Sequence, residues 1–241
     1  MSKNIEGVGE VATPSTLKEK IQNFIYHYKW QAIAAVLAVA ILVVCIVQIA
    51  SKPSYDSYIL YAGSKSIGRT STDGNTSEIT TVISSLKRIS DDFDENGEVS
   101  VNFTNYYYMS AEEVSAADDV NDALLASDRK ALSSALEHSE YYLLFISKAV
   151  YDQYKDLGEG TMFIPLGEFV NDSLSAELYA DNAILLSSTD FYGLPGICAL
   201  PSDTLICIRR PSMLTNKSKD HIAHFENAKK MLVNILSVDL G

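Results

Sequence analysis

The apolar residues of this chain are concentrated in one uninterrupted segment. From Gln31 to Ala50 the sequence has twenty residues and no charged side chain. About twenty helical residues cross a hydrocarbon core of roughly 30 Å, because each residue lengthens a helix by about 1.5 Å. A buried core helix is the alternative, but such helices are rarely apolar on every face over this length. The pattern therefore predicts a transmembrane helix over residues 31–50.

The segment before this span has the pattern of an amphipathic helix. Thr16 and Glu19 have the spacing of a capping box, which marks a helix start. The apolar side chains that share one helical face are Leu17, Ile21, Phe24, Ile25 and Tyr28. Tyr26 and Trp30 add rings suited to the membrane–water interface. We predict that residues 1–30 form a tail whose helix runs directly into the membrane.

A cleaved signal peptide is a second interpretation of the apolar segment. Signal peptides have a short basic region, an apolar run of about 7–15 residues and small residues before the cleavage site. Here the preceding region and the apolar run are both longer, and Gln48 occupies one of the positions that should be small. The sequence therefore favours a retained anchor.

The lysines that flank the span indicate its orientation. Three of them, Lys18, Lys20 and Lys29, precede it closely, whereas Lys52 and Lys65 follow it. Cytoplasmic flanks carry the excess of Lys and Arg. We predict a single-pass protein of the plasma membrane with a cytoplasmic N-terminus and residues 51–241 outside the cytoplasm.

Beyond a linker at residues 51–54, helix and strand patterns alternate through residues 55–241. The expected strands are residues 55–62, 99–103, 141–146 and 183–186, followed by a hairpin over residues 197–209. The expected helices are residues 76–90, 110–137, 148–155 and 219–236. Strand–helix–strand order implies right-handed crossovers. We predict one α/β domain with a mostly parallel sheet, ending in a hairpin and a helix.

The charge of the chain narrows the choice of partners. The formal net charge is −12, and residues 1–30 carry four Lys against three Glu. The domain after the span is therefore strongly acidic, which opposes binding to nucleic acid or to anionic lipid surfaces. The predicted partners are the bilayer, through residues 31–50, and a small solute, a peptide or an envelope protein.

Three segments resemble known families. Residues 24–36 (FIYHYKWQAIAAV) resemble the membrane entry of small membrane-anchored extracytoplasmic proteins of Firmicutes. Residues 139–169 and 200–212 resemble parts of type 2 periplasmic solute-binding proteins. The resemblance implies a solute-binding-like domain that recognises a small solute or a peptide. Whether this domain has one lobe or two stays open.

One loop has part of a calcium-binding pattern. Asp92, Asp94, Asn96 and Glu98 offer oxygen atoms at alternate positions, and Gly97 stands where such loops turn sharply. The twelfth position, which needs a bidentate Glu, is Phe103. The sequence leaves two interpretations, a weak calcium site or an acidic turn between a helix and a strand, and it predicts no other cofactor.

Two further motifs have structural explanations beside functional ones. Residues 63–70 nearly match a phosphate-binding loop, but Arg69 stands where that loop needs Lys, so a surface loop is preferred. His221 and His224 have the spacing of two metal ligands on one helix, but a third ligand is missing, so a solvated helix face is preferred.

Cysteines and tyrosines leave two more alternatives. Cys198 and Cys207 lie opposite each other in the expected hairpin, as a cross-strand disulfide or as two small packed residues. The run Tyr106–Tyr108 ends an expected strand and lines either a cleft or an ordinary packed surface.

No nucleophile elbow or paired carboxylate motif occurs, so the chain is predicted not to be an enzyme. A membrane-anchored binding or sensing module is the preferred function. A scaffold that docks another envelope protein is the alternative, and an envelope hydrolase is the third hypothesis.

Overall fold

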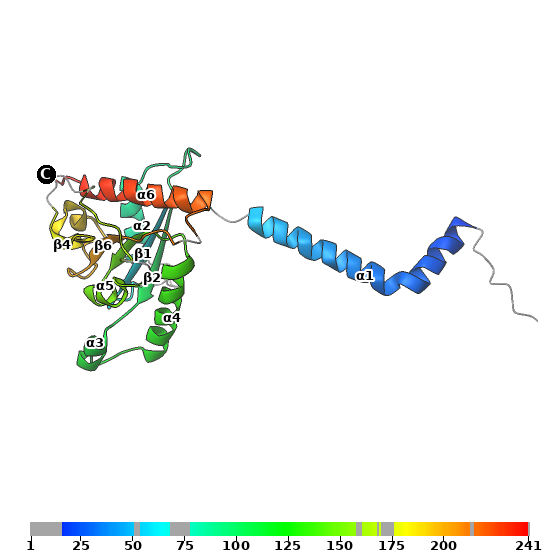
Figure 1. The fold of residues 1–241 in the computed structure, drawn as a ribbon, viewed down its shortest axis with the longest axis horizontal. Coiled ribbons are helices and arrows are strands. Elements are labelled where there is room, and N and C mark those ends of the chain that lie inside the picture. The colour runs from blue at the N-terminus through cyan, green and yellow to red at the C-terminus, as the bar shows by residue number, and fades with distance from the viewer. Residues whose placement is uncertain are drawn as a thin grey trace, which may run out of the picture. The chain divides into compact units, whose positions relative to one another are not determined.

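One long helix, α1 (Leu17–Ala50), begins the described structure (Figure 1). It is continuous over 34 residues, so the predicted amphipathic segment and the predicted span belong to the same helix. Within the described residues, its stretch Tyr28–Val47 is the only one long and apolar enough to cross a membrane, with a mean hydropathy of 2.7 and no residue buried. By length and composition, this stretch suits a membrane span or a signal sequence.

The structure is a computed structural model that describes residues 16–50, 54–67, 78–157, 161–167, 169, 176–212 and 215–240. The chain divides into two compact units, Met1–Ser54 and Tyr55–Gly241. The helices of the second unit are α2 (Glu78–Ile89), α3 (Ala111–Ala116), α4 (Asp122–His138), α5 (Lys148–Tyr154) and α6 (Lys219–Leu236), with short 3-10 helices η1 (Leu186–Ser188) and η2 (Asp190–Gly193). Its strands are β1 (Ser57–Gly63), β2 (Val101–Tyr107), β3 (Leu143–Ile146), β4 (Leu178–Ala180), β5 (Ala183–Leu185) and β6 (Leu205–Ile208).

The six strands form one mixed sheet in the order β2-β1-β3-β6-β5-β4. β1 runs parallel to β2 and β3, whereas the other three pairings are antiparallel. The domain is α/β as predicted, but the expectation of a mostly parallel sheet was wrong. β2 follows α2, and β3 follows α4. A strand can lie parallel to its neighbour only after a crossover connection, which these helices provide. β4 and β5 are joined by the tight turn at Asp181 and Asn182, which suits antiparallel neighbours, whereas residues 186–204, with η1 and η2, connect β5 to β6.

The predicted hairpin over residues 197–209 was also wrong. Residues 197–200 form turns, in which the Ile197 amide donates to the Leu194 carbonyl and the Leu200 amide donates to the Ile197 carbonyl. Only Leu205–Ile208 forms a strand, β6, and it pairs with β3 and β5. Gly196 explains the difference: its φ is +79°, and a Cβ at this position would lie 2.8 Å from the Val82 amide nitrogen. The chain therefore turns tightly against α2 here instead of extending along the sheet.

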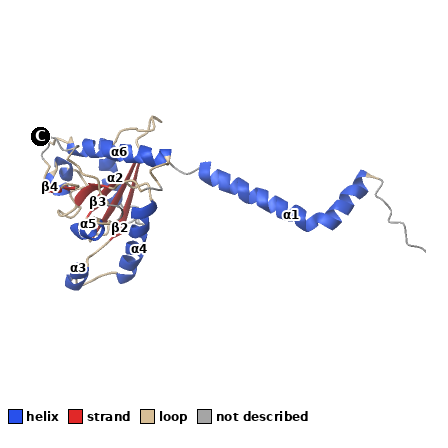
Figure 2. Ribbon diagram, viewed as in Figure 1, coloured by secondary structure: helices blue, strands red, loops and turns tan. Residues whose placement is uncertain are grey.

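Helices cover both faces of the sheet (Figure 2). α2 and α6 pack on one face and α4 and α5 on the other, with a buried apolar cluster under each pair. Alternation along β1 supplies both clusters, since Ile59 and Tyr61 point to the first and Leu60 and Ala62 to the second. The chain moves from β1 to β2 in one direction across the sheet and from β2 past β1 to β3 in the opposite direction, so right-handed crossovers place α2 and α4 on opposite faces.

Candidate functional site

Two open clefts lie along the face covered by α4 and α5. The first has a volume of about 990 Å³ and the second about 690 Å³. Ser133 of α4 and Tyr154 of α5 line both clefts, and their hydroxyl groups are hydrogen-bonded at 2.9 Å. We therefore treat the clefts as one feature, the α4–α5 groove, which is divided by this pair.

The lining of the groove changes along its length. Residues that line the first cleft include Tyr108, Ser110, Arg129, Lys130, Asp152 and Gln153. Residues that line the second cleft include Leu136, His138, Leu157, Met162, Arg210 and Pro211. The first cleft is therefore mainly polar, and the second combines an apolar wall with a cationic end.

The sequence of α4 explains how this wall forms. Leu125, Leu132 and Leu136 are buried against the sheet. Ala126 and Lys130 lie four residues apart and therefore share one helix face, which lines the groove. Asn121 caps the helix, since its side chain accepts a hydrogen bond from the Leu124 amide.

The predicted helix over residues 110–137 is in fact α3 and α4, separated by residues 117–121.

Arg129 is incompletely satisfied where it faces the first cleft. Its Nη2 donates to the Met109 carbonyl at 2.5 Å, and its guanidinium lies 5.3 Å from the centre of the Tyr108 ring. Its Nε is buried and, in the part of the chain that the structure describes, has no hydrogen-bond partner. A buried donor without a partner costs about 1–3 kcal/mol.

Arg209, which lines the second cleft, differs from Arg129 because each of its nitrogens has a hydrogen-bond partner. It is 2% exposed and donates to the carbonyls of Leu136, Ser139 and Tyr141. Its guanidinium lies 4.6 Å from the centre of the Tyr142 ring. Burial lowers the pKa of this guanidinium from its ordinary value. Arg209 ties the end of α4 to the sheet and is therefore structural.

The groove is more basic than the rest of the domain. After residue 54 the sequence has fourteen Lys and Arg and twenty-eight Asp and Glu. The groove lining includes four of these basic residues and three of the acidic ones. In an acidic domain, the groove lining thus has a small excess of basic over acidic residues, which makes it less repulsive to anionic groups than the rest of the surface.

The acidic loop, residues 92–98, folds as a series of side-chain-to-backbone turns. Asp92 accepts from the amides of Asn96 and Gly97 at 3.1 and 2.7 Å. Asp94 accepts from the Asn96 amide at 3.2 Å, and Asn96 accepts from the Glu98 amide at 2.8 Å. Gly97 has a φ of +89°, as the sharp turn of this pattern requires. The structure thus brings Asp92, Asp94 and Asn96 together around one turn.

Asp56, which precedes β1, joins this loop although sequence reasoning did not select it. Carboxylate oxygens of Asp56, Asp92 and Asp94 lie within 4.8 Å of one another. Asp56 accepts four hydrogen bonds, from the amides of Phe93, Asp94 and Ser100 and from the Ser100 hydroxyl. A carboxylate has about four lone-pair sites, so Asp56 has none left for a cation. Its part in the loop is to hold the backbone.

The remaining oxygens fit a cation only in part. Asp92 and Asp94 each accept two hydrogen bonds and keep free lone pairs. Phe103 lies in β2 opposite Ile59 and is buried, so it supplies no ligand at the twelfth position. The Glu98 amide donates a hydrogen bond within the turn, and Glu98 is exposed. Calcium at Asp92, Asp94, Asn96 and Glu98 stays a prediction.

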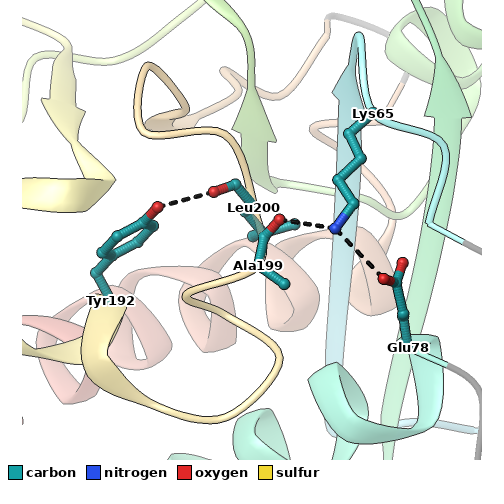
Figure 3. A network of polar contacts seen from close by, with 5 residues as sticks. All are labelled: Lys65, Glu78, Tyr192, Ala199 and Leu200. Atoms are coloured by element: carbon teal, nitrogen blue, oxygen red, sulfur yellow. Dashed lines mark hydrogen bonds and ion pairs between the residues drawn. The ribbon is translucent and has the colours of Figure 1, made fainter.

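The described part of the phosphate-loop-like segment is used for packing. Figure 3 shows the Lys65 ammonium between the Ala199 carbonyl, at 3.0 Å, and the Glu78 carboxylate, at 3.4 Å. In the same view, the Tyr192 hydroxyl donates to the Leu200 carbonyl at 2.9 Å. These contacts join the end of β1 to the start of α2 and to the turns after η2. Residues 68–70 lie outside the described residues.

The other candidates divide between packing and the groove. His221 Nδ1 lies 2.9 Å from the Tyr142 hydroxyl, and the His224 ring lies 4.5 Å from that of Tyr58, so both face aromatic neighbours. Cys198 is exposed, Cys207 is buried, and both are free thiols. Burial raises the pKa of Cys207. Tyr108, the last of the tyrosine run, lines the first cleft.

Comparisons of this chain with protein-family models, with curated proteins and with solved structures find no match.

Proposed function

We propose that the chain is a membrane-anchored binding module whose ligand site is the α4–α5 groove. The observation that carries the proposal is the first cleft, which is lined by Arg129, whose buried Nε lacks a partner among the described residues. Concave surfaces with a few convergent polar groups are the usual location of ligand sites. A likeness to type 2 solute-binding proteins is part of this proposal.

The anchor and its orientation belong to the same proposal. A retained span over residues 31–50 of α1, in the plasma membrane, would hold residues 51–241 outside the cytoplasm. The excess of lysines before the span supports this orientation. Cys198 allows a direct test, because Cys45 lies in the apolar segment and Cys207 is buried. A membrane-impermeant maleimide should label Cys198 in intact cells, and no labelling until lysis would contradict the orientation.

A thermal-shift screen tests the groove. The full-length chain in lipid nanodiscs is screened against small solutes and peptides. A ligand at about one hundred times its dissociation constant adds roughly 2.7 kcal/mol, which raises the midpoint by a few degrees. Ala126→Trp fills the first cleft, so it should abolish the shift. Ala123→Trp changes an exposed residue of the same helix that does not line either cleft and should preserve it.

The alternative function is a scaffold that docks another envelope protein. The edge strand β4 favours it, since Leu178 and Tyr179 are 45% and 42% exposed and one side of the strand lacks a neighbour in the described sheet. Exposed edges accept strands from other chains. A binding partner that is lost on Leu178→Lys but kept on Ala126→Trp would favour the scaffold over the groove.

A further inference from the structure

We infer that the ligand of the α4–α5 groove is an extended acidic peptide segment. The inference rests on the proposed function, in which this groove is the binding site. It specifies the chemistry that the groove recognises: carboxylates at two separated positions with apolar side chains between them.

The first argument is which charges of the groove already have partners. Of its three acidic residues, Asp152 pairs with Lys155 at 2.7 Å, Glu137 lies 3.4 Å from the His138 ring, and Glu112 forms no ion pair among the described residues. Among its basic residues, Arg129, Lys130 and Arg210 form no ion pair within the described ranges. The cations of the groove are therefore available to an incoming carboxylate, and guanidinium groups bind carboxylates in a two-pronged geometry.

The second argument is the length of the groove and the placement of these cations in its two clefts. Arg129 and Lys130 line the first cleft, and Arg210 lines the second. The groove follows α4 from Ala126 to His138, which at about 1.5 Å per residue is roughly 18 Å. An extended chain advances about 3.3 Å per residue, so five or six residues span this length. A small monocarboxylate would reach only one end.

The third argument is the wall between the charged ends. Leu136, Tyr154 and Met162 line the second cleft and are partly or fully buried, whereas Leu157 is 50% exposed at its rim. Apolar side chains of a bound segment would cover this surface.

The test uses fluorescence anisotropy with the full-length chain in nanodiscs of zwitterionic lipid. The probe is a fluorescein-labelled hexapeptide with Glu at both ends and Leu, Phe, Ala and Leu between them. A second probe has Lys at both ends and the same centre. The acidic probe should bind at least about tenfold more tightly, and its affinity should fall as salt is added.

Substitutions within the groove identify the contacts. Arg129→Gln should weaken binding of the acidic probe about tenfold, and Lys130→Gln or Arg210→Gln about threefold each. Lys130 and Arg210 are exposed, so these two variants keep the test valid if Arg129→Gln disturbs folding, which circular dichroism will show. Arg88→Gln, an exposed arginine of α2 on the other face, is the matched control and should change affinity less than twofold.

The outcomes separate this inference from the proposed function. No binding of the acidic probe up to about 1 mM, or equal binding of both probes, overturns the acidic-peptide ligand. If the thermal-shift screen then finds another ligand, and Ala126→Trp abolishes the shift that this ligand causes, the groove is still the binding site. If the acidic probe binds equally to wild type and to the groove variants, both the inference and the location of the site are overturned.

Discussion

The acidic loop and the α4–α5 groove are both rich in charged side chains, but these side chains differ in how far the chain itself supplies their hydrogen-bond and ion-pair partners. In the loop, Asp56 uses all its lone pairs on backbone and hydroxyl donors of the chain itself. In the groove, Arg129 keeps a buried donor unused, and the neighbouring Lys130 forms no ion pair among the described residues. The loop thus stabilises its own backbone, whereas the groove retains capacity for a ligand.

The comparison shows that charge density alone does not locate a site. Buried polar groups that lack partners are expensive, so they persist where something else repays their desolvation. Arg209 refines the point, because it also lines the groove but each of its three nitrogens donates to a carbonyl. Within one groove, some cations hold the fold and others are left for binding.

The largest expected effect is on Arg209. Arg209→Met should lower the free energy of unfolding by about 3 kcal/mol or more, because three carbonyls lose a charged donor in a buried site. Arg210→Met, at the exposed neighbour, should cost less than about 0.5 kcal/mol. Urea denaturation followed by circular dichroism measures both. Equal losses in the two variants would contradict the division of the groove cations into structural and free.

Asp56 gives the next largest effect. Asp56→Ala should lower the free energy of unfolding by about 2–3 kcal/mol, since the amides of Phe93, Asp94 and Ser100 lose a buried acceptor. Asp156→Ala removes the same charge from an exposed position and serves as the control. The same denaturation assay applies. A loss near zero for Asp56→Ala would mean that the loop is not held by this carboxylate.

The calcium hypothesis predicts a smaller stabilisation of the loop. Calcium at about ten times its dissociation constant should add roughly 1.4 kcal/mol to the wild type, visible as a rise in the thermal midpoint that a chelator reverses. Asp92→Asn should remove the rise. Glu95→Gln removes one charge from the same loop at a position between the ligands and should keep the rise. A rise that survives Asp92→Asn would place the cation elsewhere.

The smallest effect concerns pH. Burial of Asp56 raises the pKa of its carboxyl, but the hydrogen bonds from Ser100, Asp94 and Phe93 lower it by more, so the pKa lies below its ordinary value of 3.8. Above about pH 5 both folded and unfolded states are ionised and the stabilisation is complete. Below that pH the unfolded chain binds the proton first, so stability falls until the folded carboxyl is also protonated.

This pH effect is measured as the difference between wild type and Asp56→Asn in urea midpoints from about pH 6 to pH 3. The wild type should lose more stability than Asp56→Asn over the acidic part of this range. Parallel curves would assign the acid sensitivity to other carboxylates.

Local patterns predicted much of this protein correctly. The apolar run of α1, the helix α6 over Lys219–Leu236 and the parallel strands β1, β2 and β3 all follow from residue spacing. The turn at Asp92, Asp94, Asn96 and Gly97 was also predictable, because its hydrogen bonds join residues at most five positions apart. In each case the partners are close in sequence, so periodicity and turn chemistry carry the information.

Tertiary structure alone decided the rest. Asp56 meets the acidic loop from more than thirty positions away, Arg209 reaches carbonyls about seventy positions away, and Ser133 meets Tyr154 across two helices. The direction of β6 and the turn at Gly196 likewise depend on neighbours that are distant in sequence. Long-range pairing is set by the summed packing of both sheet faces and leaves no local pattern, and the α4–α5 groove therefore became visible only when the helices had packed.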